Sequence, residues 1–150
     1  MTIQEISTDH RTEQLIDQLT RLWDGSVRTT HHFLTEADIM RLRPYVGQGL
    51  QAIPVLGVAW ENGHAQGFAG LDGDKIEMLF VAADAIGQGI GRQLMEWAVA
   101  RHGATRIDVN EQNLHATAVY RHWGFAVCER RPIDDQGNPF PILRMRRSEM

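Results

Sequence analysis

The centre of the chain holds three consecutive segments with strand character, separated by turns too short to contain a helix. The first two, Ile53–Trp60 and Ala65–Leu71, flank Asn62-Gly63, a dipeptide typical of tight β-hairpins. A second turn at Gly73-Asp74 precedes the third segment, Lys75–Val81. We therefore predict an antiparallel meander around which the rest of the chain must pack.

Two helices are predicted before the meander. Apolar residues recur every three or four positions from Leu15 to Trp23, and Asp9 is a candidate cap for this helix. Thr35, followed three residues later by Asp38, resembles a capping box that opens a second helix through Tyr45.

Two more helices are predicted after the meander. One runs from Ile90 to His102 and ends at Gly103, and a shorter one is capped by Asn113 and ends at Gly124. The remaining strands are expected at Ile3–Ile6, Thr105–Val109, Phe125–Arg131 and Phe140–Arg146. The resulting order, β-α-α-β-β-β-α-β-α-β-β, predicts one domain over residues 1–150, with a mixed α/β (α+β) sheet covered by helices.

Composition narrows the classes of partner. Fifteen Lys and Arg residues against nineteen Asp and Glu give a net charge of −4, without the basic excess of a nucleic-acid-binding protein. No apolar run approaches the length of a membrane span, so we expect no membrane association. Cys128 is the single cysteine, and a lone thiol suits a reducing compartment, so a cytoplasmic location is predicted.

Three glycines, Gly87, Gly89 and Gly91, alternate where the third meander segment passes into the helix at Ile90. Glycine disfavours a helix by up to about 1 kcal/mol, so this placement requires a reason. Without Cβ atoms, backbone N–H groups can converge on a pyrophosphate at the positive end of the helix dipole. The alternative is a tight turn that needs positive φ. The P-loop ending Gly-Lys-Ser/Thr is absent, and Arg92 stands where a dinucleotide fingerprint needs glycine or alanine.

Two motifs together carry a resemblance to a known family. Gly89-Ile-Gly91 and the preceding Leu79–Val81 resemble the acyl-coenzyme-A loop and fourth strand of the GCN5-related N-acetyltransferase (GNAT) family. The segment Asn113–Tyr120, followed by Gly124-Phe125, is similar to its asparagine, alanine and tyrosine helix. The resemblance implies a mostly antiparallel sheet of about seven strands with helices on both faces. It also implies direct transfer of acetyl from acetyl-CoA to a primary amine of a small molecule or peptide, without a covalent acyl-enzyme.

The same resemblance implies a cofactor site. Its residues would be Leu79, Phe80, Val81, Gly87, Gln88, Gly89, Ile90, Gly91, Arg92, Asn113, Ala116, Tyr120 and Arg121. Ile86 stands where the family usually has arginine or glutamine, and Arg92 is expected to compensate. Arg121 and His122 are candidates for contact with the 3′-phosphate, or else surface charges that keep the protein soluble.

Catalytic roles follow from the chemistry of acyl transfer. Tyr120 matches the family's tyrosine, and by that resemblance it is the candidate acid for the departing thiolate, although its helical spacing also suits packing. Glu77 is the candidate base, acting directly or through water. Strand alternation places it on one face with Lys75 and Leu79, toward either a cleft or solvent. Asn110, a polar residue at the end of the next predicted strand, is a further catalytic candidate beside Glu77.

Substrate contacts are expected from the segment between the first two helices. His31 and Phe33 lie there, and the resemblance assigns this region to the acceptor site, with His32 as a further candidate. The histidines have no metal-site spacing, so no metal is predicted.

The last two predicted strands carry no candidate for the active site. Arg144, Arg146 and Arg147 are expected to guard an exposed strand edge, and Asp134 and Asp135 to form a turn. A non-catalytic acyl-CoA binding or sensing module would retain the glycines without a base, and an interaction domain would need neither motif. Turnover with amines separates these alternatives, and a homodimer is left open.

Overall fold

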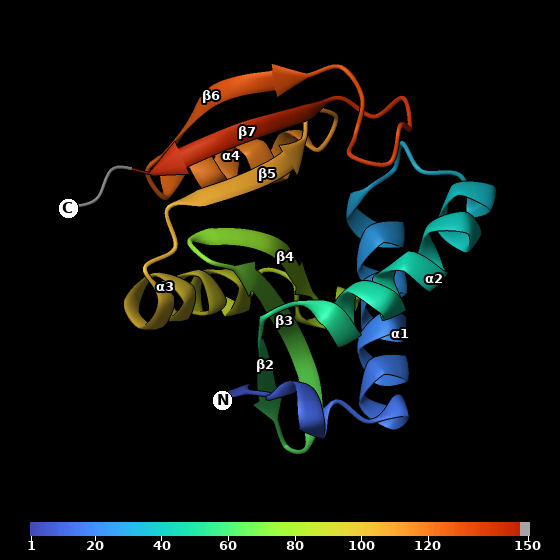
Figure 1. Ribbon diagram of the computed structural model, residues 1–150, viewed down its shortest axis with the longest axis vertical. Coiled ribbons are helices and arrows are strands. Elements are labelled where there is room, and N and C mark those ends of the chain that lie inside the picture. The colour runs from blue at the N-terminus through green and yellow to red at the C-terminus, as the bar shows by residue number, and fades with distance from the viewer. Residues whose placement is uncertain (148–150) are drawn as a thin grey trace.

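The computed structural model describes residues 1–147 as a seven-stranded sheet with four α-helices (Figure 1). The strands are β1 (Thr2–Glu5), β2 (Val55–Glu61), β3 (His64–Asp72), β4 (Lys75–Val81), β5 (Arg106–Asn110), β6 (Phe125–Arg131) and β7 (Ile142–Arg147). The helices are α1 (Glu13–Thr30), α2 (Glu36–Ala52), α3 (Ile90–His102) and α4 (Leu114–His122), with short 3₁₀ turns η1 (Thr8–His10) and η2 (Ala83–Ala85). The predicted order of elements is confirmed.

The sheet has the strand order β1-β2-β3-β4-β5-β7-β6, and among the described residues only β4 and β5 run parallel. The predicted meander is present, and its first turn has φ of 52° at Asn62 and 77° at Gly63. Both values lie in the left-handed region that a tight hairpin requires. The mostly antiparallel sheet is therefore as expected.

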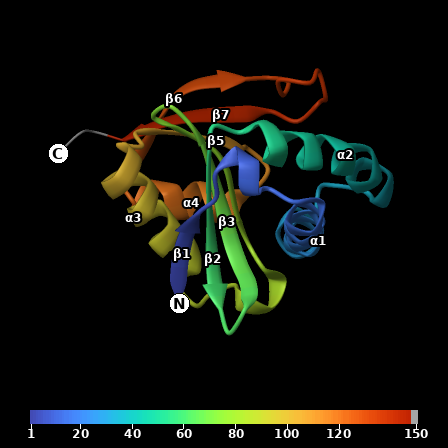
Figure 2. The same ribbon diagram turned by 60° about the horizontal axis from the view of Figure 1, so that its bottom comes forward.

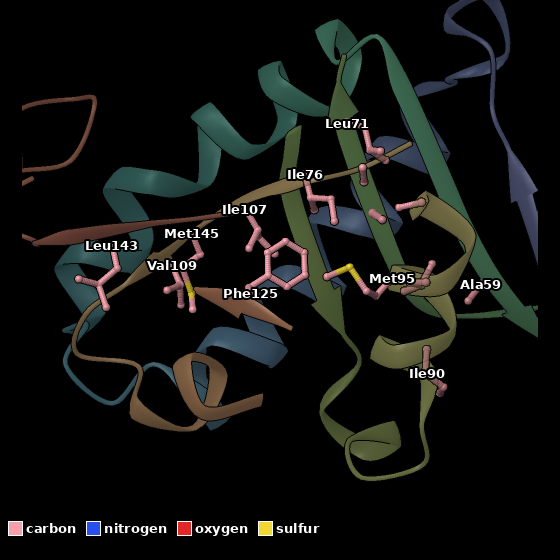
Figure 3. Packing of buried hydrophobic residues seen from close by; sticks show 14 of the residues in the cluster. Ala59, Leu71, Ile76, Ile90, Met95, Ile107, Val109, Phe125, Leu143 and Met145 are labelled. Carbon is pink, nitrogen blue, oxygen red and sulfur yellow. The ribbon is translucent and has the colours of Figure 1, made fainter. Parts of the chain in front are cut away.

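Each face of the sheet carries one pair of helices, α1 with α2 and α3 with α4 (Figure 2). On the α1–α2 face, Leu19, Leu50 and Phe68 are completely buried. On the other face, Ile76, Ile107 and other strand residues pack with Met95 of α3 (Figure 3). Helices on both faces, as predicted, give the chain two hydrophobic cores separated by the sheet.

The first helix differs from its prediction at both ends. Asp9 is not its cap, because Asp9 lies in η1 and the Thr12 hydroxyl instead accepts a hydrogen bond from the Leu15 N–H at 3.1 Å. The helix also continues past Gly25 to Thr30. It does so because its buried face continues through Val27, which is 1% exposed.

The second helix opens with the predicted capping box of Thr35 and Asp38. It continues beyond Tyr45 to Ala52, although Pro44 lies inside it. The burial of Leu50 in the α1–α2 core favours this extension.

The C-terminal arginines do not guard an edge, so that prediction was wrong. β7, which carries Arg144 and Arg146, lies between β5 and β6, and β6 forms the edge of the sheet on that side. Arg144 forms ion pairs with Asp108 at 3.9 Å and Glu129 at 3.8 Å on the two neighbouring strands. Its charge therefore joins strands of the sheet.

A bulge in β4 changes which side chains share a face. Leu71 of β3 pairs with Ile76 and Gly70 pairs with Met78, so Glu77 is the additional residue. As a result, Met78 packs on the α1–α2 core while Leu79 packs on the α3–α4 core with Ile76. The predicted common face of Lys75, Glu77 and Leu79 was wrong, because strict alternation does not survive the bulge.

The Arg11 side chain connects the segment after β1 with the last turn of α2 and the residues that follow it. Arg11 is 4% exposed, and its guanidinium donates hydrogen bonds to the carbonyls of Ile6, Leu50, Gln51 and Ile53, at 2.6 to 3.2 Å. Two of these carbonyls, Leu50 and Gln51, belong to the last turn of α2, where no helical N–H is available. Burial lowers the pKa of Arg11. The carbonyl oxygens compensate for the water that this charge has lost.

We expect Arg11→Met to lower the free energy of unfolding by about 3 kcal/mol, since several buried carbonyls lose their donor. Urea denaturation measures this loss. Arg21→Met is the matched control: Arg21 also belongs to the α1 region, but its side chain is 72% exposed and pairs with Asp17 on the same helix. The control should change stability by less than about 0.5 kcal/mol. Equal losses in the two variants would contradict the role assigned to Arg11.

Candidate active site

The parallel strands β4 and β5 are paired over a very short length. Only Lys75 with Arg106 and Ile76 with Ile107 are in register among the described residues. From the second pair onward, residues 76–81 of β4 and 107–110 of β5 line a cavity of about 410 Å³. The cavity thus opens between β4 and β5, which are neighbouring strands at the centre of the sheet.

Ion pairs and hydrogen bonds hold the two strands together at the base of this opening. Asp74 accepts hydrogen bonds from the Thr105 hydroxyl at 2.9 Å and from the Arg106 guanidinium at 2.7 and 2.9 Å. These bonds, from Arg106 first and then Thr105, lower the pKa of Asp74. One residue further on, the Lys75 ammonium lies 2.9 Å from Asp108. The strands are therefore joined where they begin and free where they end.

The cavity is lined from both faces of the sheet. The α1 side contributes Ser26, Thr30 and His31. The other side contributes the residues around the α3 N-terminus and on α4, namely Ile86, Gly87, Gly89, Ile90, Gly91, Arg92, Asn113, His115, Ala116, Val119, Tyr120 and Trp123. Because α1 and the α3–α4 pair cover opposite faces, the cavity passes through the sheet.

The glycine turn exposes backbone donors at one end of the cavity. Gly87 and Gly89 have φ of 87° and 82°, so the turn itself needs both glycines. Gly89 is the N-cap of α3 and supplies no side-chain acceptor to the first helical turn. The N–H groups at the start of α3 therefore remain available to an anion.

Arg92 does not stand free beside the turn. Its Nε donates to the Glu96 carboxylate at 3.0 Å, one helical turn further along α3. Ile86, which stands where the family resemblance predicts arginine or glutamine, is 37% exposed. An anion at this turn would therefore meet mainly backbone N–H groups.

Tyr120 lies against the same cavity from α4. Its ring packs with Trp123 and Phe125, at centroid distances of 5.8 and 6.4 Å. Burial raises the pKa of its phenol to about 12. The hydroxyl is therefore protonated at physiological pH and can act as a hydrogen-bond donor.

Glu77 and Asn110 line the cavity from the two strands. The Glu77 carboxylate lies 3.3 Å from the Lys75 ammonium, which it shares with Asp108. The Asn110 side chain accepts the Gln112 N–H at 2.9 Å and so shapes the turn before α4. The Glu77 carboxylate is thus ion-paired with Lys75, and the side-chain oxygen of Asn110 is already engaged in a hydrogen bond to the Gln112 N–H.

His31 ends α1 and contacts the cavity, whereas Phe33 packs behind it. The Phe33 ring lies 5.4 Å from the His31 ring and 5.8 Å from that of Phe140 in the β6–β7 connection. Burial, with a smaller contribution from His32, lowers the pKa of His31 to about 4. His31 is therefore a neutral imidazole at physiological pH.

Most of the residues predicted for the site meet in this one cavity. Those that do not line it are Gln88, Arg121, Phe33 and the additional candidates His32 and His122. Sequence analysis missed Ser26, Thr30, Asp108 and His115. Ser26 and Thr30 continue the buried stripe of Leu19 and Trp23 at helical spacing, and this signal was lost because the helix was expected to end earlier.

Two features are absent from the part of the chain that the structure describes. Residues 1–147 contain no group of three or more His, Cys, Asp or Glu side chains arranged to hold a metal ion. None of the described helices is long and apolar enough to cross a membrane.

The sheet that opens between β4 and β5, with helices on both faces, has the architecture that the family resemblance led us to expect, and comparison with known proteins agrees. Residues 29–147 match the family model of the acetyltransferase (GNAT) domain. The chain belongs to the GNAT family, so it is an acetyl-CoA-dependent N-acetyltransferase. The family resemblance stated from the glycine and tyrosine motifs is confirmed.

Individual relatives also match over most of the chain. The chain is 35% identical over 129 residues to the peptidyl-lysine N-acetyltransferase YjaB of Salmonella typhimurium strain LT2, covering 86% of this chain and 89% of that protein. It is 34% identical to YjaB of Escherichia coli strain K12, with 86% and 88% covered. The solution structure of apo-form Escherichia coli YjaB matches with a TM-score of 0.84 at 31% identity over both whole chains.

A more distant neighbour shares the fold. The crystal structure of the PaiA N-acetyltransferase from Thermoplasma acidophilum, solved in complex with coenzyme A, has a TM-score of 0.65 at 20% identity. It covers 97% of this chain and 99% of that one.

Proposed function

We propose that this N-acetyltransferase acts on the side-chain amine of a lysine in a peptide or protein. The observation that carries the proposal is the cavity that passes through the sheet between β4 and β5. Two substrates can enter such a cavity from opposite faces and meet between the strands. The relatives that match over most of the chain are named peptidyl-lysine N-acetyltransferases, which supports a lysine as the acceptor.

The proposed acetyl-CoA site follows the α3–α4 side of the cavity. The N–H groups that follow Gly87 and Gly89 suit the diphosphate. Leu79, Phe80 and Val81 would run beside the pantetheine, with Asn113 and Ala116 opposite. Gln88 and Arg121 lie outside the cavity lining and remain predicted contacts with the outer part of the cofactor.

The proposed chemistry uses few side chains. Backbone N–H groups of residues 79–81 would stabilise the thioester oxygen as negative charge develops on it. The protonated Tyr120 hydroxyl would donate to the departing thiolate. The amine must lose a proton before it attacks, and Glu77 would accept it directly or through water, with Asn110 nearby as a polar contact.

The setting of the reaction is also part of the proposal. The exposed lone thiol of Cys128 favours a reducing compartment, and we propose the cytoplasm.

Gly89→Ala should weaken coenzyme-A binding about tenfold or more, because a Cβ would lie between the ligand and the backbone donors. Gly103→Ala is the matched control, since Gly103 caps the other end of α3 with φ of 63°. A Cβ at either glycine meets no protein atom within 4 Å, so both variants should lose similar stability, about 1 kcal/mol. Calorimetric titration with coenzyme A separates them. Equal affinities in the two variants would show that no ligand approaches Gly89.

Tyr120→Phe should lower kcat by about 10²-fold or more while leaving acetyl-CoA binding nearly unchanged, since the phenol acts on the leaving group. The ring that packs with Trp123 and Phe125 is retained. Tyr45→Phe is the control, because Tyr45 is 53% exposed on α2 and lies outside the cavity lining. Release of coenzyme A is measured with chemistry limiting. A rate for Tyr120→Phe within twofold of wild type would make Tyr120 a packing residue.

The acceptor is tested with a peptide that has an acetylated N-terminus and a single lysine. Mass spectrometry after incubation with acetyl-CoA should show one added acetyl group on the lysine. The same peptide with arginine in place of lysine should remain unmodified. Acetylation of polyamines or aminoglycosides, with none of the peptide, would overturn the lysine proposal while leaving the N-acetyltransferase activity in place.

A further inference from the structure

A chain of hydrogen bonds crosses the cavity from α1 to α4. It starts at the Ser26 carbonyl, which receives the Thr30 hydroxyl at 2.8 Å. The same hydroxyl oxygen lies 2.8 Å from Nδ1 of His31, and Nε2 of His31 lies 3.4 Å from Nδ2 of Asn113. Asn113 is the N-cap of α4 and His31 the C-cap of α1, so the bond between them joins the two sides of the site.

The direction of these bonds defines the tautomer of His31. A carbonyl oxygen only accepts, so the single hydroxyl hydrogen of Thr30 is donated to Ser26. The Thr30 oxygen must then accept the bond from His31, which places a hydrogen on Nδ1. A neutral imidazole that carries its hydrogen on Nδ1 has a free lone pair on Nε2.

The opposite end of the chain leads to the same assignment. The Asn113 side-chain oxygen accepts the Ala116 N–H at 3.1 Å, so its amide nitrogen is the group that points toward His31. An amide NH₂ only donates, and its partner Nε2 must therefore accept. Both ends of the network agree on an unprotonated Nε2 at the cavity.

The surroundings of the His31 ring keep Nε2 unprotonated, and the hydrogen bond of Nε2 with Asn113 is weak. The His31 ring lies near Phe33 and Phe80, at centroid distances of 5.4 and 6.3 Å, and its pKa is lowered to about 4 by burial. The contact with Asn113 is long for a hydrogen bond, so a better donor can replace it. So weak a base is unsuited to take a proton from an alkylammonium group, but it accepts a hydrogen bond from one.

We propose that Thr30 is a positioning residue that holds His31 as the Nδ1–H tautomer, so that Nε2 accepts an N–H of the acceptor amine and aligns it in the cavity. The inference rests on the proposed function for the presence of an amine substrate. It adds a residue to the acceptor site, Thr30, and a definite chemical form to another, His31. In this form the ring accepts hydrogen bonds at the cavity and donates only toward α1.

The tautomer is tested without any substrate. Nitrogen-15 NMR of the labelled protein distinguishes a ring nitrogen that carries hydrogen from one that does not. In the wild type we expect Nδ1 of His31 to carry the hydrogen and Nε2 to be bare at pH 7. Thr30→Val should shift the population toward the Nε2–H tautomer, and Thr30→Ser, which keeps the hydroxyl, should restore it. An Nε2–H tautomer or a doubly protonated ring in the wild type would overturn the proposal.

The positioning role is tested by kinetics with an amine that the wild type acetylates. Thr30→Val should lower kcat/KM for the amine about tenfold, with the KM for acetyl-CoA within twofold of wild type. Thr29→Val is the matched control: Thr29 is the neighbouring residue, and its hydroxyl bonds to the Gly25 carbonyl in the same way but is exposed. The control should leave the amine kinetics unchanged.

A double variant shows whether Thr30 acts through the imidazole. His31→Phe keeps a ring against Phe33 and Phe80 and removes both nitrogens. In this background, Thr30→Val should cause no further loss. An additional tenfold loss there would mean that Thr30 acts on stability or packing, which would overturn the inference. If the wild type acetylated no amine at all, the proposed function would fail, whereas the NMR result would still decide the tautomer.

Discussion

The short pairing between β4 and β5 is the constraint on which the rest of the site depends. Two parallel strands that kept their register would close the sheet with backbone hydrogen bonds and leave no space between them. Here the pairing stops after Ile76 and Ile107, and the charges of Asp74, Lys75, Arg106 and Asp108 hold the strands together at that point. The opening above is then lined by strand backbone and reached by helices from both faces.

Much of this arrangement was readable from the sequence, because turns and caps are local. Asn62-Gly63, the Thr35 capping box and the glycine at the end of α3 each define a boundary through the conformation of one or two residues. The glycine and tyrosine motifs located two walls of the cavity for the same reason. They are contiguous segments whose spacing is maintained by a single turn or helix.

The parts that sequence reasoning missed depend on contacts between distant segments. The bulge at Glu77 becomes visible only when β4 is aligned against Gly70 and Leu71 of β3. The interior position of β7 follows from pairing between strands that are far apart in the sequence. Ser26 and Thr30 were overlooked because Gly25 suggested an end to α1, whereas packing of Val27 carries the helix one turn further. In each case tertiary packing outweighed a local signal.

The uncharged character of the glycine turn has a consequence for how the protein responds to its medium. Exposed cationic side chains lose much of their attraction for phosphate as ionic strength rises, because counter-ions screen their charge. The donors at the start of α3 are fixed peptide dipoles, and the guanidinium of Arg92, in the first turn of this helix, forms an ion pair with Glu96. A diphosphate bound as we propose would be held by short hydrogen bonds from these N–H groups more than by charged side chains. Salt also screens the helix dipole, so the affinity is expected to fall as ionic strength rises, but less steeply than at a site built from exposed lysines and arginines.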